Sequence, residues 1–291
     1  RVMAFWKVIR PGLQGNRHWF RNGKLVLLSC CILGVILWGC KKDDPDPEDP
    51  YGKIRITFAH QVDGQAVQQD TMVYTNEAGN DYLITEVQYF ISDVTLHHSD
   101  GRKILIDEWK DIHYVDLDLP ETMTWEVFDK LPVGQYEKIT FTFGINAEKN
   151  KTLMFLNPPE RDMFWPVFLG GGYHYLKING KWLTPQSDIY SFNFHLGIGQ
   201  IYASNVIVVD SITGFVQNYF EVDLPQSSFT LTDGGTVQIP LVMNIANWFR
   251  TPHVYNHDNE GGYTMQTQST MQKIKENGWD VFSVASSKKG G

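Results

Sequence analysis

YGKIRITFAH, residues 51–60, is the stretch that decides the fold class of this chain. From Ile54 to His60 its large apolar side chains alternate with polar or small ones. A period of two puts alternate side chains on opposite faces, as in a strand with one buried face. The same alternation returns at 139–145, 190–196 and 237–243. These segments predict half-buried β-strands.

Further strands and the turns between them complete the predicted fold. We expect strands at 82–98, 112–117, 173–178, 205–210 and 218–223. Turn signals separate them at Asp63-Gly64, Ala78-Gly79-Asn80, Asp100-Gly101, Asn179-Gly180 and Asp233-Gly234-Gly235. Many strands with short turns predict an all-β fold, an antiparallel and barrel-like β-sandwich.

One helix is expected near the C-terminus, at about residues 265–276. Met271 and Ile274 would face the core, and Asn277-Gly278 would end the helix. A shorter turn is expected at 244–249.

A different pattern precedes the strands. Basic residues without any acidic one lead to an apolar run at 25–37, and Trp38-Gly39-Cys40 follows. A basic region, a short apolar region and a small residue before the cut are typical of a secretory signal. The run is too short for a spanning helix, which needs about 20 apolar residues. We therefore expect a signal peptide at 1–39 and a lipid anchor on Cys40, as in bacterial lipoproteins. An uncleaved anchor would leave the protein at the same membrane.

The next segment predicts an extended tether. Residues 41–50 are charged or proline and carry no apolar side chain. We expect a tether at 40–51 and a single domain at 52–291. Lysine followed by acids after the anchor resembles the surface-export signal of Bacteroidetes lipoproteins, and a plain spacer is the alternative. The expected place is the outer membrane, facing the periplasm or the cell surface.

Charge and cysteine content exclude several classes of function. Six of the 25 basic residues and none of the 33 acidic ones precede Cys40, which leaves a mature net charge of −14. Nucleic-acid binding needs a basic surface, so it is not expected. Cys30 and Cys31 lie in the predicted signal, so cysteine-ligated zinc and cysteine nucleophiles are excluded. Because no acid–base or nucleophile motif is visible, we expect no enzyme.

Two segments carry candidate metal ligands. Residues 162–177 combine Met163, Trp165, a glycine run and His174, and His195 lies in the later strand. In a cysteine-free exported chain, imidazole with thioether suits copper. The alternative is that Met163 and Trp165 are core residues, the glycines a turn and His174 a packed histidine.

Strand parity separates the histidines. His60 and His174 fall on the apolar faces of their predicted strands. A buried imidazole needs a hydrogen-bond partner or a metal. His195 falls on the polar face with Ser191 and Asn193, so it would face solvent or a polar cleft.

Three motifs in this order resemble the MbnP-like copper-binding family. They are Met163-Phe164-Trp165, Gly172-Tyr173 and Phe194-His195-Leu196-Gly197. Residues 87–94 and 141–146 are similar to two strands of that family, and the resemblance covers most of 52–245. Residues 247–249 and 276–282 resemble the closing segment of its Bacteroidetes branch.

The resemblance implies an extracytoplasmic copper binder for copper acquisition, storage or delivery. In some members a tryptophan is oxidised to kynurenine by a di-haem peroxidase-like partner and then lies at the copper, and Trp165 is the matching residue. We expect His195 and at least one of His60 and His174 to bind one copper, with Met163 and Trp165 in or beside the coordination sphere. An outer-membrane receptor is another possible partner.

The chain departs from the family pattern at two places. Methanotroph members have a cysteine soon after His-Leu-Gly, and this chain has none. They often have a histidine after an asparagine that follows the 141–146 strand, and here Lys151 follows Asn150.

The alternative function is a cell-surface module that binds glycan or a protein through exposed aromatics, namely Trp109, Trp125 and Trp182.

Overall fold

The structure is a computed structural model that describes residues 49–285. The predicted signal peptide, Cys40 and almost all of the predicted tether lie outside these residues. Within them, no helix is long and apolar enough to cross a membrane.

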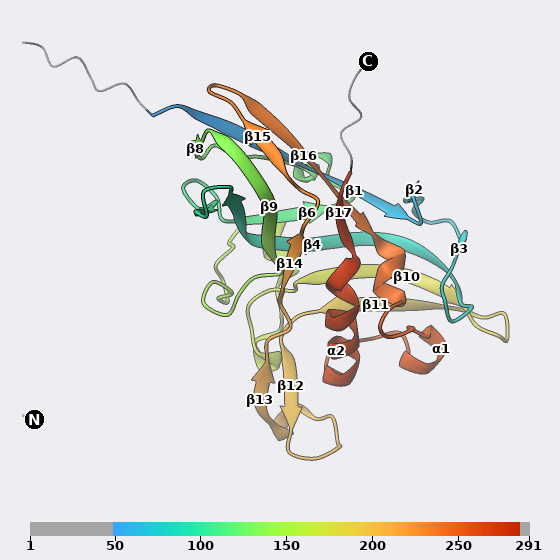
Figure 1. The fold of residues 1–291 in the computed structure, drawn as a ribbon. Helices are drawn as coiled ribbons and strands as arrows, with labels where there is room; N and C mark the ends of the chain where they lie inside the picture. Colours follow the sequence, from blue (N-terminus) through green and yellow to red (C-terminus); the bar gives the residue numbers. More distant parts are fainter. Residues whose placement is uncertain (1–48, 286–291) are drawn as a thin grey trace, which may run out of the picture. The chain divides into compact units, whose positions relative to one another are not determined.

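The larger sheet has nine strands, all paired antiparallel, and carries the candidate ligands (Figure 1). Its main path is β11 (Ile189–Leu196), β10 (Leu176–Leu183), β4 (Asp81–His98), β9 (Gly134–Phe143) and β14 (Phe220–Leu224). Four short strands join it, β3 (Tyr74–Thr75), β5 (Lys103–Leu105), β6 (Ile112–Asp116) and β15 (Phe229–Leu231).

The smaller sheet has six strands and one parallel pair. Its strands are β17 (Phe282–Val284), β16 (Thr236–Asn244), β1 (Tyr51–Val62), β2 (Gln65–Ala66), β7 (Thr124–Glu126) and β8 (Leu131–Pro132). β1 runs parallel to β16, from Lys53 beside Thr236 to Gln61 beside Asn244. The fold is thus the predicted β-sandwich, but one long pairing is parallel. The described residues form no closed barrel.

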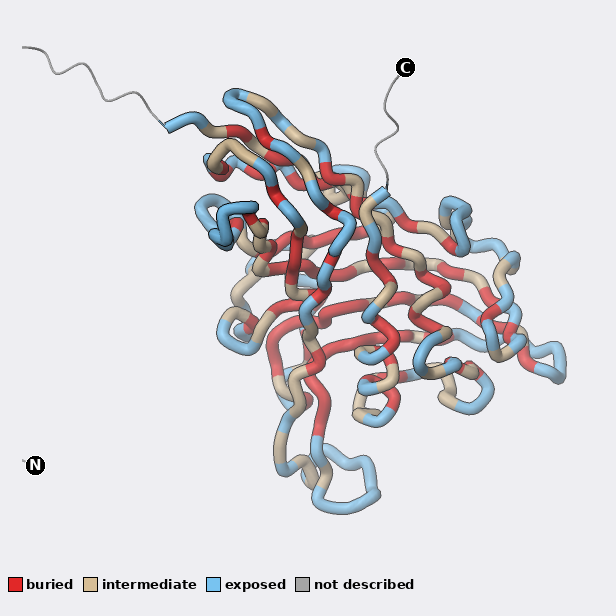
Figure 2. Tube along the Cα trace, viewed as in Figure 1, coloured by how far each residue is buried: buried red, intermediate tan, exposed pale blue. Residues whose placement is uncertain are grey.

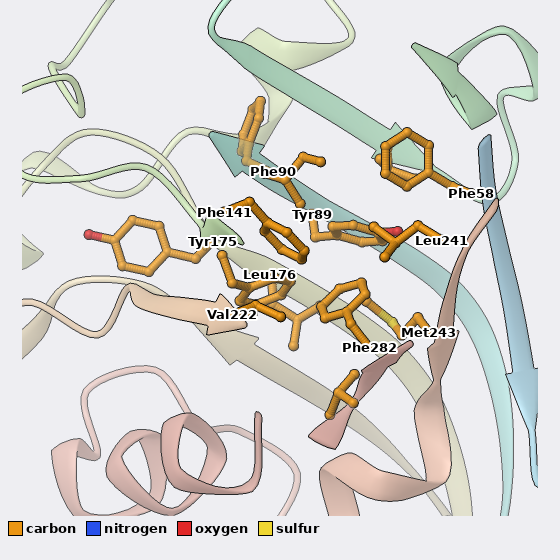
Figure 3. Close-up of a cluster of buried hydrophobic side chains, with 14 of the residues drawn as sticks. Phe58, Tyr89, Phe90, Phe141, Tyr175, Leu176, Val222, Leu241, Met243 and Phe282 are labelled. Carbon is orange, nitrogen blue, oxygen red and sulfur yellow. The ribbon is translucent and has the colours of Figure 1, made fainter. Parts of the chain in front are cut away.

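The core lies between the two sheets. Figure 3 shows side chains of the smaller sheet, Phe58, Leu241, Met243 and Phe282, close to Tyr89, Phe141, Leu176 and Val222 of the larger one. The alternation that predicted the strands appears directly in β1, where Ile54, Ile56 and Phe58 are buried. In Figure 2 the buried positions follow the strands through the body of the molecule, while loop tips are exposed.

Helical segments are few and short. They are α1 (His257–Glu260), α2 (Gln268–Asn277), and six 3-10 turns: η1 (Pro120–Met123), η2 (Glu160–Met163), η3 (Val167–Leu169), η4 (Val209–Ser211), η5 (Ile245–Phe249) and η6 (Gly278–Asp280). The predicted helix is confirmed as α2, with Met271 and Ile274 buried and Gly278 as its C-cap. The predicted turn at 244–249 is η5.

The strand predicted at 205–210 is wrong. These residues form the tip of a hairpin between β12 (Gly199–Tyr202) and β13 (Ile212–Val216), and they end in η4. The run from Val206 to Val209 has the branched side chains of a strand, but no strand among residues 49–285 pairs with it.

The turn predicted at Asn179-Gly180 is also wrong. Both residues lie inside β10, where the pairing with β4 shifts register at a bulge. A Cβ on Gly180 would lie 2.1 Å from the carbonyl oxygen of Leu83, so glycine serves close packing here. The predicted strand at 173–178 accordingly begins later and runs on to Leu183.

A long connection between β9 and β10 covers part of the outer face of the larger sheet. Its Phe155 ring stacks on Phe90 of β4 at 5.5 Å between ring centroids, and Tyr173 also contacts Phe90. This connection carries Met163, Trp165 and His174, so it brings them against the face that bears His195.

Candidate metal centre

A tight turn at 163–174 holds the candidate residues. The amide of Trp165 donates to the carbonyl of Gly172 at 2.8 Å, and that of His174 donates to Met163 at 2.7 Å. Gly172 has φ +76°, and a Cβ there would lie 2.5 Å from Oδ1 of Asn150. The glycine run therefore lets the chain reverse tightly and return His174 to Met163.

The rings of Trp165, His174 and His195 form a continuous row. Trp165 and His174 lie 4.6 Å apart between centroids, with their planes at 73°. His174 and His195 lie 4.9 Å apart with their planes at 87°. All three are buried. The two imidazoles thus meet edge to face in the interior.

One ring nitrogen of His174 is bare, which means that it carries no proton and its lone pair has no partner among the described residues. Its Nδ1 lies 2.9 Å from the carbonyl oxygen of Met163, which can only accept a hydrogen bond. Nδ1 therefore carries the proton, and Nε2 does not. Nε2 is buried and has no hydrogen-bond partner among residues 49–285.

His195 presents the opposite nitrogen. Its Nε2 lies 2.8 Å from Oδ1 of Asn179, and the amide nitrogen of Asn179 donates to the carboxylate of Glu86. This arrangement places the proton on Nε2, so Nδ1 is the bare nitrogen. Nδ1 is also buried without a partner in the described part of the chain.

Both imidazoles are held neutral. Burial lowers the pKa of His174 to about 3, and the positive charge of Lys177 contributes to this lowering. Burial, then His174 and Lys177, hold the pKa of His195 well below its usual range. A neutral imidazole is the form that binds a metal.

The structure brings four of the five predicted ligand residues together. Met163 and Trp165 are fully buried beside His174, as the core interpretation also predicted. His195 faces neither solvent nor an open cleft, because the turn at 163–174 covers it and Thr264 bonds its backbone.

Strand parity predicted that His174 lies on the apolar face of its strand, and this prediction is wrong. β10 begins at Leu176, so strand alternation does not extend back to His174. Its ring instead meets His195, which shares the outer face of the sheet with Lys177.

His60 lies elsewhere. It is buried on β1, where its ring lies 5.6 Å from that of Tyr89, on the side of β4 that faces the core. Both of its ring nitrogens lack a hydrogen-bond partner among residues 49–285. Its role as a ligand stays a prediction.

The protein donors at this site are two imidazoles rather than a larger cluster. Within residues 49–285, no group of three or more His, Cys, Asp or Glu side chains could hold a metal. A third donor would have to be of another type, such as the thioether of Met163, Trp165 or an external ligand.

Sequence reasoning missed Asn179 and Glu86. Asn179 falls in a predicted turn, and Glu86 falls within the predicted strand at 82–98 without a role of its own. The available signal was parity, since Asn179 shares a strand face with Lys177, the register partner of His195. That signal requires the strand to continue past Asn179-Gly180.

Comparison with known proteins identifies the family. A family model for MbnP matches residues 51–271. The chain belongs to the MbnP family. Among solved structures, MbnP from Methylosinus trichosporium is similar at 15% identity, with 69% of this chain and 78% of that chain covered and a TM-score of 0.46. No curated protein matches the sequence. The match to the MbnP family model includes every candidate ligand residue, and membership rests on that match.

Proposed function

We propose that this protein binds one copper ion between Nε2 of His174 and Nδ1 of His195. The observation that carries the proposal is the pair of buried, bare ring nitrogens on two facing imidazoles. A buried lone pair without a partner costs free energy, about 1–3 kcal/mol for a neutral group, and a bound metal would offset this cost.

The donor chemistry favours copper over other common metals. Structural zinc sites take four ligands, and calcium and magnesium take oxygen donors. Two neutral imidazoles suit copper, and the thioether of Met163, whose backbone carbonyl contacts His174, would add a soft donor that favours copper further. Membership of the MbnP family supports the same choice, because the sequence resemblance to that family implies a copper binder.

Trp165 has a proposed role at the copper. Its indole N–H donates to the carbonyl of Leu169 at 3.1 Å, and its ring packs against His174. Oxidation of Trp165 to kynurenine by a di-haem peroxidase-like partner would place new polar donors beside the two imidazoles.

The proposed setting is a lipid anchor on Cys40 in the outer membrane. A copper site in that place serves acquisition, storage or delivery rather than catalysis. The protein is accordingly proposed to be a binding protein, and an outer-membrane receptor is a second candidate partner.

Copper titration tests the proposal. Purified protein should take up one copper, and His174→Ala and His195→Ala should each remove most of the affinity. His253→Ala is the matched control, because His253 lies apart from the site and contacts Glu276. Variants that bind as tightly as the wild type would refute the site.

Of the three tryptophans expected to be exposed for glycan binding, Trp109 alone is exposed. Trp125 and Trp182 are buried, contrary to expectation, because their rings pack into the core. Trp109 is 69% exposed and lies 6.4 Å from the exposed ring of Phe128. Retention on immobilised glycans that Trp109→Ala abolishes would favour this alternative.

A further inference from the structure

Three adjacent strands carry a row of hydrogen-bonded side chains that runs from Glu86 to His195. Glu86 on β4 is the register partner of Asn179 on β10. The Asn179 amide nitrogen donates to the Glu86 carboxylate, and the Asn179 oxygen accepts from Nε2 of His195 at 2.8 Å. The link therefore runs from a half-buried carboxylate to a buried imidazole.

The direction of each hydrogen bond in this row follows from the carboxylate of Glu86 at its start. A carboxylate can only accept, so the nitrogen of the Asn179 amide must face Glu86. The amide oxygen then faces His195, and an oxygen can only accept. Nε2 of His195 must therefore carry the proton, which leaves Nδ1 bare.

We propose that Glu86, acting through Asn179, is a positioning residue that fixes the tautomer of His195 and so selects Nδ1 as the metal-binding nitrogen. This inference rests on the proposed copper site. Outer hydrogen bonds of this kind orient ligating histidines and raise their basicity.

The two histidines differ in which groups fix their tautomers. The tautomer of His174 is set by the backbone carbonyl of Met163, which no side-chain substitution removes. The tautomer of His195 is set by side chains alone. Lys177 and the carboxylates of Glu86 and Asp116 also lie near this face, and Lys177 donates to the carbonyl of Asp162 at 3.1 Å.

Glu86→Gln is the decisive variant, because it keeps size and shape but can donate as well as accept. The Asn179 amide is then free to turn over, and Nε2 of His195 can become the bare nitrogen. Nitrogen-15 NMR of the metal-free protein reports which nitrogen is protonated. We expect wild-type His195 in a single Nε2–H form, a mixed population in Glu86→Gln, and no change in Glu137→Gln, an exposed position on β9.

Copper affinity supplies the second measurement. Loss of an outer partner typically lowers metal affinity by about 10–100-fold, and we expect Glu86→Gln to fall in that range. The double variant Glu86→Gln with Asn179→Asp should recover both the single tautomer and most of the affinity. In it, the new amide at position 86 donates to the new carboxylate at position 179. That carboxylate can only accept, so Nε2 of His195 again carries the proton.

The outcomes separate this inference from the proposed function. A Glu86→Gln protein with an unchanged His195 tautomer and unchanged copper affinity overturns the inference. A wild type that binds no copper overturns the proposed function, and the tautomer shift in the metal-free protein still decides whether Glu86 positions His195.

Discussion

Gly197 lies directly against the indole of Trp165. A Cβ on Gly197 would come within 2.5 Å of Cε3 and Cζ3 of that ring, closer than real Cβ contacts. Gly197 follows the last residue of β11, two positions after His195. The end of this strand and the turn that carries Trp165 can approach each other only because Gly197 has no side chain.

We therefore expect Gly197→Ala to push Trp165 away from the histidine pair. Overpacking of this kind typically costs about 1–3 kcal/mol, and copper affinity should fall as well. Denaturant unfolding and copper titration measure the two effects. Gly214→Ala is the control, because its Cβ would meet Ile201 at 3.4 Å in the exposed hairpin. Equal behaviour of the two variants would contradict the close contact at Trp165.

His257 gives a pH-dependent prediction away from the proposed copper site. It is fully buried among aromatic rings, 4.4 Å from Phe192 between centroids, and neither ring nitrogen has a partner within the described residues. Burial lowers its pKa to about 4, although the carboxylate of Asp258 raises it in part.

The sign of the effect follows from linkage. The folded pKa is depressed below the unfolded value of about 6.5, so the unfolded state takes up a proton first as pH falls. Stability from this group is present above about pH 6.5 and is lost towards about pH 4, by up to about 1.4 kcal/mol per pH unit. His257→Phe should remove this loss, so the urea midpoint of the variant relative to the wild type should be higher at about pH 5 than at about pH 8. A difference that is the same at both pH values would contradict the assignment.

Trp165→Phe tests the proposed oxidation. When the protein is co-expressed with a di-haem peroxidase-like partner, peptide mass spectrometry should find an altered mass at Trp165 in the wild type. The Phe variant should show no such change and should bind copper more weakly than the modified wild type. An unaltered Trp165 in protein that binds copper tightly would show that oxidation is not needed.

The anchor prediction concerns residues outside 49–285. Cys40 should be the mature N-terminus and carry lipid, so Cys40→Ser should release the protein from membranes or stall its processing. Membrane fractionation with intact-mass analysis measures this. A Cys40→Ser protein of mature size that still fractionates with membranes would contradict the lipoprotein assignment.

The strands were predictable where one face is buried and the other is polar. Ile54 to Phe58 alternates cleanly because β1 lies between the core and solvent. The pattern fails at Val206 to Val209, where branched side chains occupy a hairpin tip. Local propensity is the same in both places, and only tertiary pairing distinguishes them.

The candidate site was predictable in its residues but not in its connections. The sequence pointed to His60, Met163, Trp165, His174 and His195, and all of these except His60 lie together. The direction of His174 depends on where β10 begins, and the role of Asn179 depends on a bulge that resembles a turn in the sequence. Both depend on pairing between distant strands, which periodicity does not encode.

The parallel pairing of β1 with β16 has a consequence for biogenesis. Lys53 pairs with Thr236, 183 positions further along the chain. The first strand among the described residues therefore has no partner on that edge until almost all of the polypeptide has been made. Contacts this distant in sequence form slowly, because the intervening chain must first be closed into a loop. In the meantime β1 exposes an unpaired edge that can pair with other chains, so slow closure of this pairing favours aggregation.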